Sequence, residues 1–400
     1  MMLKTHSKTK PGVVVLGGGA NTLSVARSLG RRGIKVTCIT HCHEYVRFSR
    51  YCDFIPIPTQ HNMQQFLEDY LLDNNAHHLH GSVLMACSDL GLEVLINKKD
   101  ELSKKYILDI MNRKAQRNML DKLSSYKAAK DANVPCPRFW IFKSIEEATV
   151  FAQDVGFPIM IKPRFTHKFD ELYGRKYLLA HDKNELYRHL DFFAKHDNQG
   201  IFLEYIPGPD SQLCSYYTYI DKNGIPLFHF TKRIIRRYPK NEGLGCYHIT
   251  DNIDEVKQLG LRLLKKSGLI GLANTEFKRD HRDGKLKFIE CNARFTAVNC
   301  LLEKSGIDLV SFVYDRLIGQ PSEPPVSYVV GKRLWYPMED FASFLQMRRD
   351  DEITFSAYVK SLLHFQTFPY FAWDDLLPSI IGNFLHMWRI LMKIGSILKR

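Results

Sequence analysis

The feature that most restricts the fold is a glycine loop between an apolar run and a helical pattern near the start of the chain. Residues 13–16 (VVVL) stop at Gly17-Gly18-Gly19, a helical pattern continues to Arg31, and a second apolar run, IKVTCIT, follows at 34–40. A strand, a glycine turn, a helix and a second strand in this order form a βαβ unit with parallel strands. The sequence therefore predicts an α/β protein that begins with a doubly wound parallel sheet.

The remaining patterns divide the chain into three predicted domains. Residues 82–88 (SVLMACS) predict a later strand of the first sheet, so residues 11–115 form an N-terminal α/β domain. Residues 116–320 alternate strands and helices and then, from Leu213, show antiparallel strands with hairpin turns at Asn223-Gly224 and Asp283-Gly284, typical of an α+β domain. The segment GQPSEPP (319–325) is a linker, and residues 321–400 are expected to form a mostly helical C-terminal extension.

The charge of the chain is unusual, although its composition is ordinary. Hydrophobic residues make up 45% and charged residues 25%, which excludes a disordered or fibrous protein. The 56 Lys and Arg exceed the 43 Asp and Glu by 13, which favours anionic partners. Residues 228–240 hold five cations and residues 381–400 hold four, with no acid in either segment, so most of the excess lies in two clusters.

Targeting signals are not apparent in the sequence. No window of 18 uncharged apolar residues occurs, so a spanning helix is not expected. The N-terminus, MMLKTHSKTKPG, is basic but lacks the apolar core of a secretory signal. The nine cysteines are odd in number and dispersed, and are interpreted as reduced thiols of a cytoplasmic protein.

The glycine loop carries only a weak functional signal. It matches the first two glycines of G-x-G-x-x-G, but Thr22 replaces the third, and no acid precedes Glu44 at the end of the second strand to bind a ribose. A tight strand-to-helix turn without a nicotinamide cofactor is therefore favoured. The amides at this helix N-terminus remain candidates for an anion or substrate site, with Gly18, Gly19 and Asn21 as its residues.

The strongest chemical signal lies at residues 274–294 (NTEFKRDHRDGKLKFIECNAR). Glu276 and Glu290 fall on two strands joined by a tight turn, and Asn292 and Arg294 follow Glu290 at two-residue steps, so all can face one side. Two carboxylates and an amide suit Mg²⁺, and a neighbouring arginine suits a transferring phosphoryl group. The alternative is a solvated strand face with ordinary charges.

Further candidates lie upstream. Lys162 ends the apolar strand pattern FPIMIKP, and Lys122 lies forty residues earlier; two such lysines can grip nucleotide phosphates. Glu204 stands in LEYIPGPD, where the backbone of Tyr205 and Ile206 can read adenine and Asp210 can accept ribose hydroxyls.

The order of these motifs resembles the ATP-grasp superfamily. The 14-residue step from Glu276 to Glu290 and the E-x-N-x-R motif at 290–294 are similar to the carbamoyl-phosphate-synthetase-like and D-aspartate-ligase-like carboxylate–amine ligases. The resemblance covers about residues 13–320. It implies a Rossmann-like (pre-ATP-grasp) N-terminal domain, a two-lobed ATP-grasp fold and, beyond it, the helical extension.

The resemblance also implies roles for individual residues. Lys122 and Lys162 would contact ATP phosphates, Glu204 and the Tyr205-Ile206 backbone would hold adenine, and Asp210 would hold ribose. Glu276, Glu290 and Asn292 would bind Mg²⁺ or Mn²⁺, Arg294 would stabilise the transition state, and Lys232 and Arg236 would lie near phosphate or the carboxylate substrate. A solvated basic loop is the alternative for Lys232 and Arg236.

The implied function is an ADP-forming ligase that joins a carboxylate to an amine through an acyl phosphate. Because an acyl phosphate hydrolyses in water, a closing lid is expected at residues 164–200, although this loop holds only Gly174 where many members are glycine-rich. The alternatives are an ATP-dependent carboxylase that uses carboxyphosphate and a non-catalytic ATP-binding sensor. Nucleic-acid binding is not expected, because no helix-turn-helix, zinc-finger or RNP pattern occurs.

The C-terminal segment has two open interpretations. In residues 381–400 the polar positions His386, Arg389, Lys393, Ser396 and Arg400 recur at steps of three and four, opposite apolar residues that include Trp388. Such a basic amphipathic helix either lies on an anionic membrane surface or packs on the protein itself or on a second subunit of a homodimer.

Overall fold

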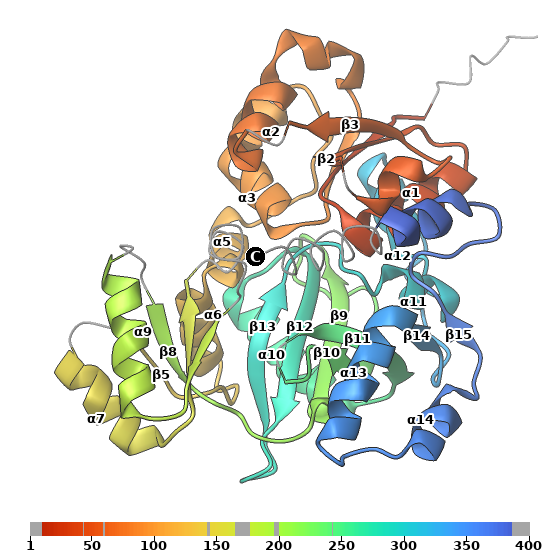
Figure 1. The fold of residues 1–400 in the computed structure, drawn as a ribbon. Helices are drawn as coiled ribbons and strands as arrows, with labels where there is room; N and C mark the ends of the chain where they lie inside the picture. Colours follow the sequence, from red (N-terminus) through yellow and green to blue (C-terminus); the bar gives the residue numbers. More distant parts are fainter. Residues whose placement is uncertain are drawn as a thin grey trace, which may run out of the picture. The chain divides into compact units, whose positions relative to one another are not determined.

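A computed structural model describes residues 10–42, 44–58, 61–141, 145–164, 177–195, 200–241 and 243–385. The chain forms two compact units (Figure 1). The first unit takes residues 1–109, 294–325 and 367–400, and the second takes residues 110–293 and 326–366. Each unit is therefore assembled from stretches that are far apart in the sequence.

The first unit is built on a parallel four-stranded sheet of order β3-β2-β1-β4. Every residue of β1 is almost fully buried, as expected for a parallel strand covered on both faces. Its strands are β1 (Val13–Leu16), β2 (Val36–His41), β3 (Asp53–Ile57) and β4 (Val83–Ala86). Its helices are α1 (Gly19–Arg31), η1 (Tyr45–Phe48), α2 (Met63–Leu72), η2 (Asn74–Leu79), α3 (Asp89–Asn97) and α4 (Lys99–Leu102).

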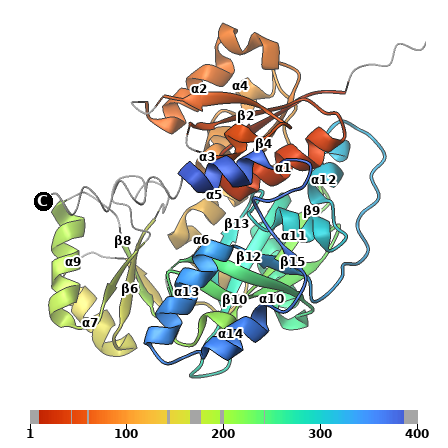
Figure 2. The same ribbon diagram turned by 45° about the vertical axis from the view of Figure 1, so that its right-hand side comes forward.

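Two later stretches of the chain complete the first unit. Residues 294–325 contain α11 (Asn299–Lys304) and α12 (Leu309–Leu317), and the Phe295 N–H donates to the Ala86 carbonyl at the end of β4. Residues 367–385 end in a helix at 377–385 that lies beside α1 in both views (Figure 2).

The second unit contains a small antiparallel sheet of order β5-β8-β6-β7. Alternate residues of its strands, such as Ile159 and Ile161, pack with α7 and α9 in one apolar core, so both helices cover the same face (Figure 1). The elements are α5 (Arg113–Leu120), α6 (Lys122–Asp131), β5 (Phe139–Ile141), α7 (Ile145–Val155), β6 (Ile159–Pro163), β7 (Leu178–Ala180), α9 (Lys183–Lys195) and β8 (Gly200–Glu204).

A seven-stranded sheet of order β13-β12-β9-β10-β11-β14-β15 forms the rest of the second unit. It is antiparallel from β13 to β14, and α13 lies along β10 (Figure 2). The elements are η3 (Asp210–Gln212), β9 (Leu213–Ile220), β10 (Phe230–Tyr238), β11 (Leu244–Asp251), α10 (Asp254–Ser267), β12 (Gly271–Arg279), β13 (Leu286–Asn292), β14 (Arg333–Trp335), α13 (Pro337–Arg349), α14 (Phe355–Leu362) and β15 (Gln366–Thr367).

The mixed α/β class predicted from the sequence is confirmed. The segment expected to form a mostly helical C-terminal extension also contributes strands: residues 333–335 form β14, which pairs with β11, and residues 366–367 form β15 of the same large sheet. The short strand β14 has no helical or strand periodicity of its own, so only the unpaired edge of β11 decides its conformation. The proposed boundaries at residues 115 and 320 stay a prediction, because the two compact units do not follow the order of the chain.

Candidate functional site

The second unit brings the three predicted metal ligands onto one face of a strand pair. β12 and β13 pair antiparallel, with Glu276 directly opposite Glu290 and Asn274 opposite Asn292. The tight turn between the strands, closed by the Gly284 N–H on the Asp280 carbonyl, precedes pairs that run as far as Phe277 opposite Phe288, and a register shift between Phe277 and Glu276 then brings Glu276 opposite Glu290. Since opposed residues share a face of the sheet, four polar side chains gather there.

The two carboxylates converge on a single group. The Asn292 Nδ2 atom lies 3.4 Å from Glu276 Oε1 and 3.4 Å from Glu290 Oε1, and Asn274 Nδ2 donates to Glu276 Oε1 at 3.1 Å. A half-turn of the Asn292 amide would add its carbonyl oxygen to the carboxylate oxygens. This oxygen set fits a hard divalent cation. Among the described residues no group of three or more His, Cys, Asp or Glu is arranged for a metal, so the candidate site consists of two carboxylates and an amide.

Lys122 reaches this site because the start of α6 is tied to the end of β6. Asp121 caps α6 by accepting from the Leu123 N–H, and it also binds the Arg164 guanidinium with N–O distances of 3.1 and 2.5 Å. The Lys122 N–H in turn donates to the Arg164 carbonyl. Held in this way, Lys122 Nζ donates to Glu290 Oε2 at 2.7 Å.

Lys162 lies among the same charges. On β6 the buried residues Ile159 and Ile161 alternate with Met160 and Lys162, which face away from the apolar core of the small sheet. Burial is the largest cause that lowers the pKa of Lys162 to about 8; the Lys122 charge also lowers it, and the Glu290 and Glu276 charges raise it. These influences indicate that both lysines and both carboxylates belong to one electrostatic site.

The predicted adenine-binding segment begins at the end of β8. The Glu204 carboxylate accepts from the Arg138 N–H at 3.0 Å and from Arg282 at 2.7 Å, so it ties β5 and the 280–285 turn to this segment. Burial alone would raise the pKa of Glu204, but these bonds and the Lys287 charge lower it. The Ile206 carbonyl accepts from Lys278 Nζ at 2.9 Å, and the same ammonium lies 5.5 Å from the centre of the Tyr205 ring.

Asp210 is paired within the unit. Its carboxylate accepts from Arg237 Nε at 2.6 Å and from the Asn241 N–H at 3.0 Å. Arg237 is adjacent in sequence to Arg236 but has different partners, and the pairing of β10 with β11 shifts register between the two residues. Asp210 therefore stands beside a cation and not alone at a surface.

Lys232 is a buried cation next to the carboxylates. Burial lowers its pKa, whereas the Glu276 charge raises it. Its Nζ lies 3.4 Å from His248 Nδ1, while His248 Nε2 lies 2.9 Å from the Gly245 carbonyl. Burial and the Lys232 charge hold the pKa of His248 well below its usual value, so this histidine is neutral, donates from Nε2 and accepts from the lysine.

Arg236 was predicted to lie near phosphate or the carboxylate substrate, but its partners are residues of the protein. Its guanidinium forms a buried two-bond pair with Asp340 of α13, at 2.7 and 3.0 Å, and lies between the rings of Tyr247 and Tyr358. Ser361 accepts a further bond at 2.9 Å. These partners occupy the guanidinium with contacts that join α13 and α14 to the sheet.

Four predicted site residues belong to the first unit. Arg294 Nε donates to Asp89 of α3 at 2.5 Å. The Gly19 N–H donates to Glu44 Oε2 at 2.5 Å, and a Cβ atom on Gly18 would lie 2.3 Å from the Glu44 side chain. Asn21 donates to the Cys87 carbonyl at 2.8 Å. An anionic substrate at the glycine loop would therefore have to displace Glu44 from the start of α1.

Several residues at the site escaped the sequence reasoning. Lys278, Arg237 and His248 were not singled out, and neither was the Asp121–Arg164 pair. Lys278 had a usable signal, since Asn274, Glu276 and Lys278 alternate along one strand. His248 had none, because its neighbour Lys232 lies on a different strand. Residues 165–176 and 196–199 of the expected lid lie outside the described residues, as do residues 386–400.

None of the described helices is both long and apolar enough to cross a membrane.

Comparison with known proteins yields matches in sequence and in structure. Residues 121–195 match the family described as the ATP binding domain of the carbamoyl-phosphate synthase L chain. The chain is 24% identical to the D-aspartate ligase of Enterococcus faecium over 327 residues, which is 77% of each protein.

Solved structures share the fold at low identity. An N5-carboxyaminoimidazole synthetase from Staphylococcus aureus, complexed with ADP, has a TM-score of 0.62 and 17% identity over 82% of both chains. The biotin carboxylase domain of a Hydrogenobacter thermophilus 2-oxoglutarate carboxylase, a dimer with MgADP and bicarbonate, has a TM-score of 0.60 and 18% identity over 80% of this chain and 73% of that one. The ordered motifs from Lys122 to Asn292, the family match over residues 121–195 and this shared fold support the resemblance of the chain to the ATP-grasp superfamily.

Proposed function

We propose that the protein is an ATP-dependent ligase that joins a carboxylate to an amine through an acyl phosphate and releases ADP and phosphate. One observation carries this proposal: Glu276, Glu290 and Asn292 converge at one point, with Lys122 bonded to Glu290 and Lys162 within their electrostatic influence. A bound nucleoside triphosphate needs cations to offset the negative charge of its phosphates and oxygen ligands to hold its divalent metal ion.

The nucleotide would be held by residues of both sheets of the second unit. Lys122 and Lys162 would bind the phosphates, and the backbone of Glu204, Tyr205 and Ile206 would bind adenine. Asp210 would accept ribose hydroxyls from its position beside Arg237. Glu204 takes part through its backbone, because its carboxylate is already bonded to the Arg138 N–H and Arg282.

Glu276, Glu290 and Asn292 would hold the divalent cation, Mg²⁺ or Mn²⁺. When bound, the cation neutralises phosphate charge and favours displacement at the terminal phosphorus. Lys122 would stay bonded to Glu290 and would also donate to a phosphate oxygen.

The ligase chemistry requires activation of an otherwise unreactive acid. A carboxylate oxygen attacks the terminal phosphorus of ATP, ADP leaves, and the amine then displaces phosphate from the acyl phosphate. Lys232 would offset the charge of the meeting anions, because it is buried next to Glu276, and His248 would orient it. Arg294 would stabilise the developing charge. For Arg236 we propose a positioning role, because Asp340 and two tyrosine rings enclose its guanidinium.

The relative named D-aspartate ligase supports an amino acid as the carboxylate substrate. The carboxylase alternative is not favoured by that relative, although carboxylases share the fold. The sensor alternative is not favoured either, because all three metal-binding side chains are retained and face one another.

Further features of the proposal concern the domains, the oligomer and the location of the protein. The parallel order β3-β2-β1-β4 supports a Rossmann-like N-terminal domain, and residues 164–200 are proposed as the lid. The dimer described for the Hydrogenobacter domain supports a homodimer. Gly18, Gly19 and Asn21 stay proposed substrate contacts, and a cytoplasmic location stays a proposal.

The proposal is tested by phosphate release from ATP across panels of amino acids paired with amines. We expect one acid and amine pair to raise the rate, and Glu290→Gln to lower kcat by at least about a hundredfold, since it removes a charged ligand whose effect is largest in the transition state. Arg279→Gln is the matched control, because this β12 cation pairs with Glu255 at the exposed end of the strand. No stimulation by any pair, together with unchanged background hydrolysis in Glu290→Gln, would show that the proposal is wrong.

A further inference from the structure

Three polar side chains of β12 follow one another along the face of the large sheet that carries the candidate site. β12 lies between β13 and β9 (Figure 1) and pairs with β9 residue by residue, so Asn274, Glu276 and Lys278 share one face at steps of about 7 Å. Lys278 Nζ donates to the Ile206 carbonyl of the proposed adenine-binding segment. Since Glu276 is a proposed ligand of the divalent cation, the strand leads from the base toward the phosphates.

Asn274 continues this order beyond the proposed cation site. It lies one step past Glu276, on the side away from Lys278. The acid that accepts the terminal phosphoryl group and the amine that follows it must bind beyond the terminal phosphate, since the rest of the nucleotide lies on the other side of that group. Asn274 is therefore at the end of the site where the proposed ligase needs its substrates.

The Asn274 side chain has a buried oxygen without a donor. Asn274 is 1% exposed, and its Nδ2 donates to Glu276 Oε1 at 3.1 Å. This bond fixes the orientation of the amide, because a carboxylate only accepts. No donor to Asn274 Oδ1 is found in the part of the chain that the structure describes. A buried acceptor normally has a partner, and Glu276 and Asn292 beside it are only partly buried, so a ligand on this face can supply one.

The charges around Asn274 distinguish between the two substrates. An amide oxygen binds an N–H donor, whereas a carboxylate would be repelled both by this oxygen and by Glu276. A place for the carboxylate is offered across the sheet by the buried cation Lys232. Ser215 of β9 lies opposite both Glu276 and Lys232, so the acceptor and the cation are on different strands around Glu276.

We infer that Asn274 Oδ1 binds the amine substrate, an inference that rests on the proposed ligase function. An uncharged amine that donates one N–H to Oδ1 keeps its lone pair for the acyl carbon. As the C–N bond forms, the bond between the acyl carbon and the phosphate oxygen breaks, and the phosphate leaves with that electron pair and takes the proton that the nitrogen loses. One N–H is held and another is lost, so the substrate class is ammonia or a primary amine.

The test compares Asn274→Leu with Asn274→Asp in ATP-dependent phosphate release. The probes are the amine with the highest kcat/KM in the panel described above and its N-methyl derivative. We expect the KM for the amine to rise at least about tenfold in Asn274→Leu, because a hydrogen bond is lost, with a smaller change in the KM for ATP. Asn274→Asp keeps an acceptor oxygen but loses the N–H to Glu276, so its KM for the amine should rise much less.

Lys278→Met is the matched control, because Lys278 lies on the same face of β12 at the proposed base-binding end. It should raise the KM for ATP more than the KM for the amine. In the unmodified protein the N-methyl derivative should have a lower kcat/KM than its parent amine, because its single N–H cannot be both held and lost. Thermal melting reports whether each variant is folded.

The inference is overturned if folded Asn274→Leu raises both KM values equally or changes only the requirement for Mg²⁺. It is also overturned if Asn274→Asp raises the KM for the amine as much as Asn274→Leu, because Asn274 then serves only to hold Glu276. Should Asn274→Leu not fold, equal use of the N-methyl derivative and its parent overturns it. If no amine stimulates the unmodified protein, the proposed function fails and the inference fails with it.

Discussion

At the residue scale, the candidate site depends on a few ionisable side chains whose charge the fold adjusts. Lys162 and Lys278 both have pKa values lowered to about 8, mainly by burial, and both lie in the second unit with Glu276. Burial favours the neutral form of a lysine, and a nearby anion favours its charged form. A bound phosphate would supply such an anion at Lys162.

This gives a prediction for the pH dependence of ATP binding. The folded pKa of Lys162 lies below the unfolded value, so Lys162 is mostly charged at neutral pH, half charged near pH 8 and mostly uncharged above it. We expect the KM for ATP to rise above pH 8, approaching about tenfold per pH unit, since one required proton is lost. The measurement is KM for ATP between pH 6 and pH 10, at saturating metal.

Lys162→Arg is the informative variant, because arginine stays charged throughout this range. Its KM should be higher at pH 7 but nearly constant with pH. If Lys162→Arg keeps the same rise above pH 8, another group such as Lys278 is responsible, and the assignment to Lys162 fails.

At the element scale, the Arg236–Asp340 pair joins α13 to β10. Both side chains are almost completely buried, and Asp340 also accepts from the Trp335 indole at 2.9 Å. We expect Asp340→Leu to destabilise the protein by about 3–5 kcal/mol, because it leaves a buried guanidinium without its counterion. The urea dependence of unfolding measures this change.

A second substitution in the same chain tests the physical reason. Adding Arg236→Met to Asp340→Leu should recover part of the loss, because no buried charge remains, although the unpaired Trp335 N–H still costs about 1–3 kcal/mol. If the double variant is less stable than Asp340→Leu, packing and not the uncompensated charge explains the effect. If Arg236→Met alone also abolishes phosphate release while the protein remains folded, the positioning role is contradicted.

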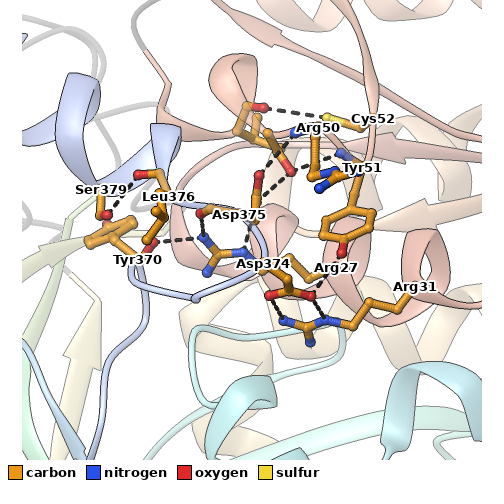
Figure 3. Close-up of polar contacts among 12 residues, drawn as sticks. Arg27, Arg31, Arg50, Tyr51, Cys52, Tyr370, Asp374, Asp375, Leu376 and Ser379 are labelled. Atoms are coloured by element: carbon orange, nitrogen blue, oxygen red, sulfur yellow. Dashed lines mark hydrogen bonds and ion pairs between the residues drawn. The ribbon is translucent and has the colours of Figure 1, made fainter.

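At the scale of a whole unit, two arginine–aspartate pairs attach the C-terminal segment to α1 (Figure 3), and one pair is buried whereas the other is partly exposed. Arg27 and Asp375 are buried, whereas Arg31 and Asp374 have side chains that are 30% and 42% exposed. The Arg31 bond holds the pKa of Asp374 well below its usual range, so this carboxylate stays ionised at neutral pH. The two pairs join the same elements and differ mainly in burial.

We therefore expect Arg27→Met to cost about 3–5 kcal/mol and Arg31→Met no more than about 1 kcal/mol. Thermal denaturation measures both, and hydrogen exchange of residues 367–385 should accelerate in Arg27→Met only. Equal effects of the two substitutions would show that burial of the Arg27 pair does not determine the attachment.

Local patterns predict many of the elements and the spacing of the proposed metal ligands. The apolar runs at 13–16 and 157–163 contain strands, and the turn near Asp283 joins the two strands that carry Glu276 and Glu290. These features depend on neighbours within one or two elements, so periodicity and turn chemistry are sufficient to predict them. The E-x-N-x-R spacing similarly determines which side chains share a strand face.

Long-range partners could not be predicted in this way. Nothing in the basic segment 228–240 distinguishes Lys232, which meets His248, from Arg236, which meets Asp340 of α13. Glu44 is also not a readable partner for the Gly19 N–H, because 25 residues separate them. In each case the identity of the partner depends on which elements pack together.

The sequence by itself determined the α/β class, the superfamily motifs and the oxygen ligands on two adjacent strands, because short-range spacing sets which side chains share a face. Only the tertiary structure decided which cations serve the site and which are buried in ion pairs. The reason is energetic: a charged side chain is either a ligand contact or a structural partner according to what surrounds it, and packing between distant segments supplies those surroundings.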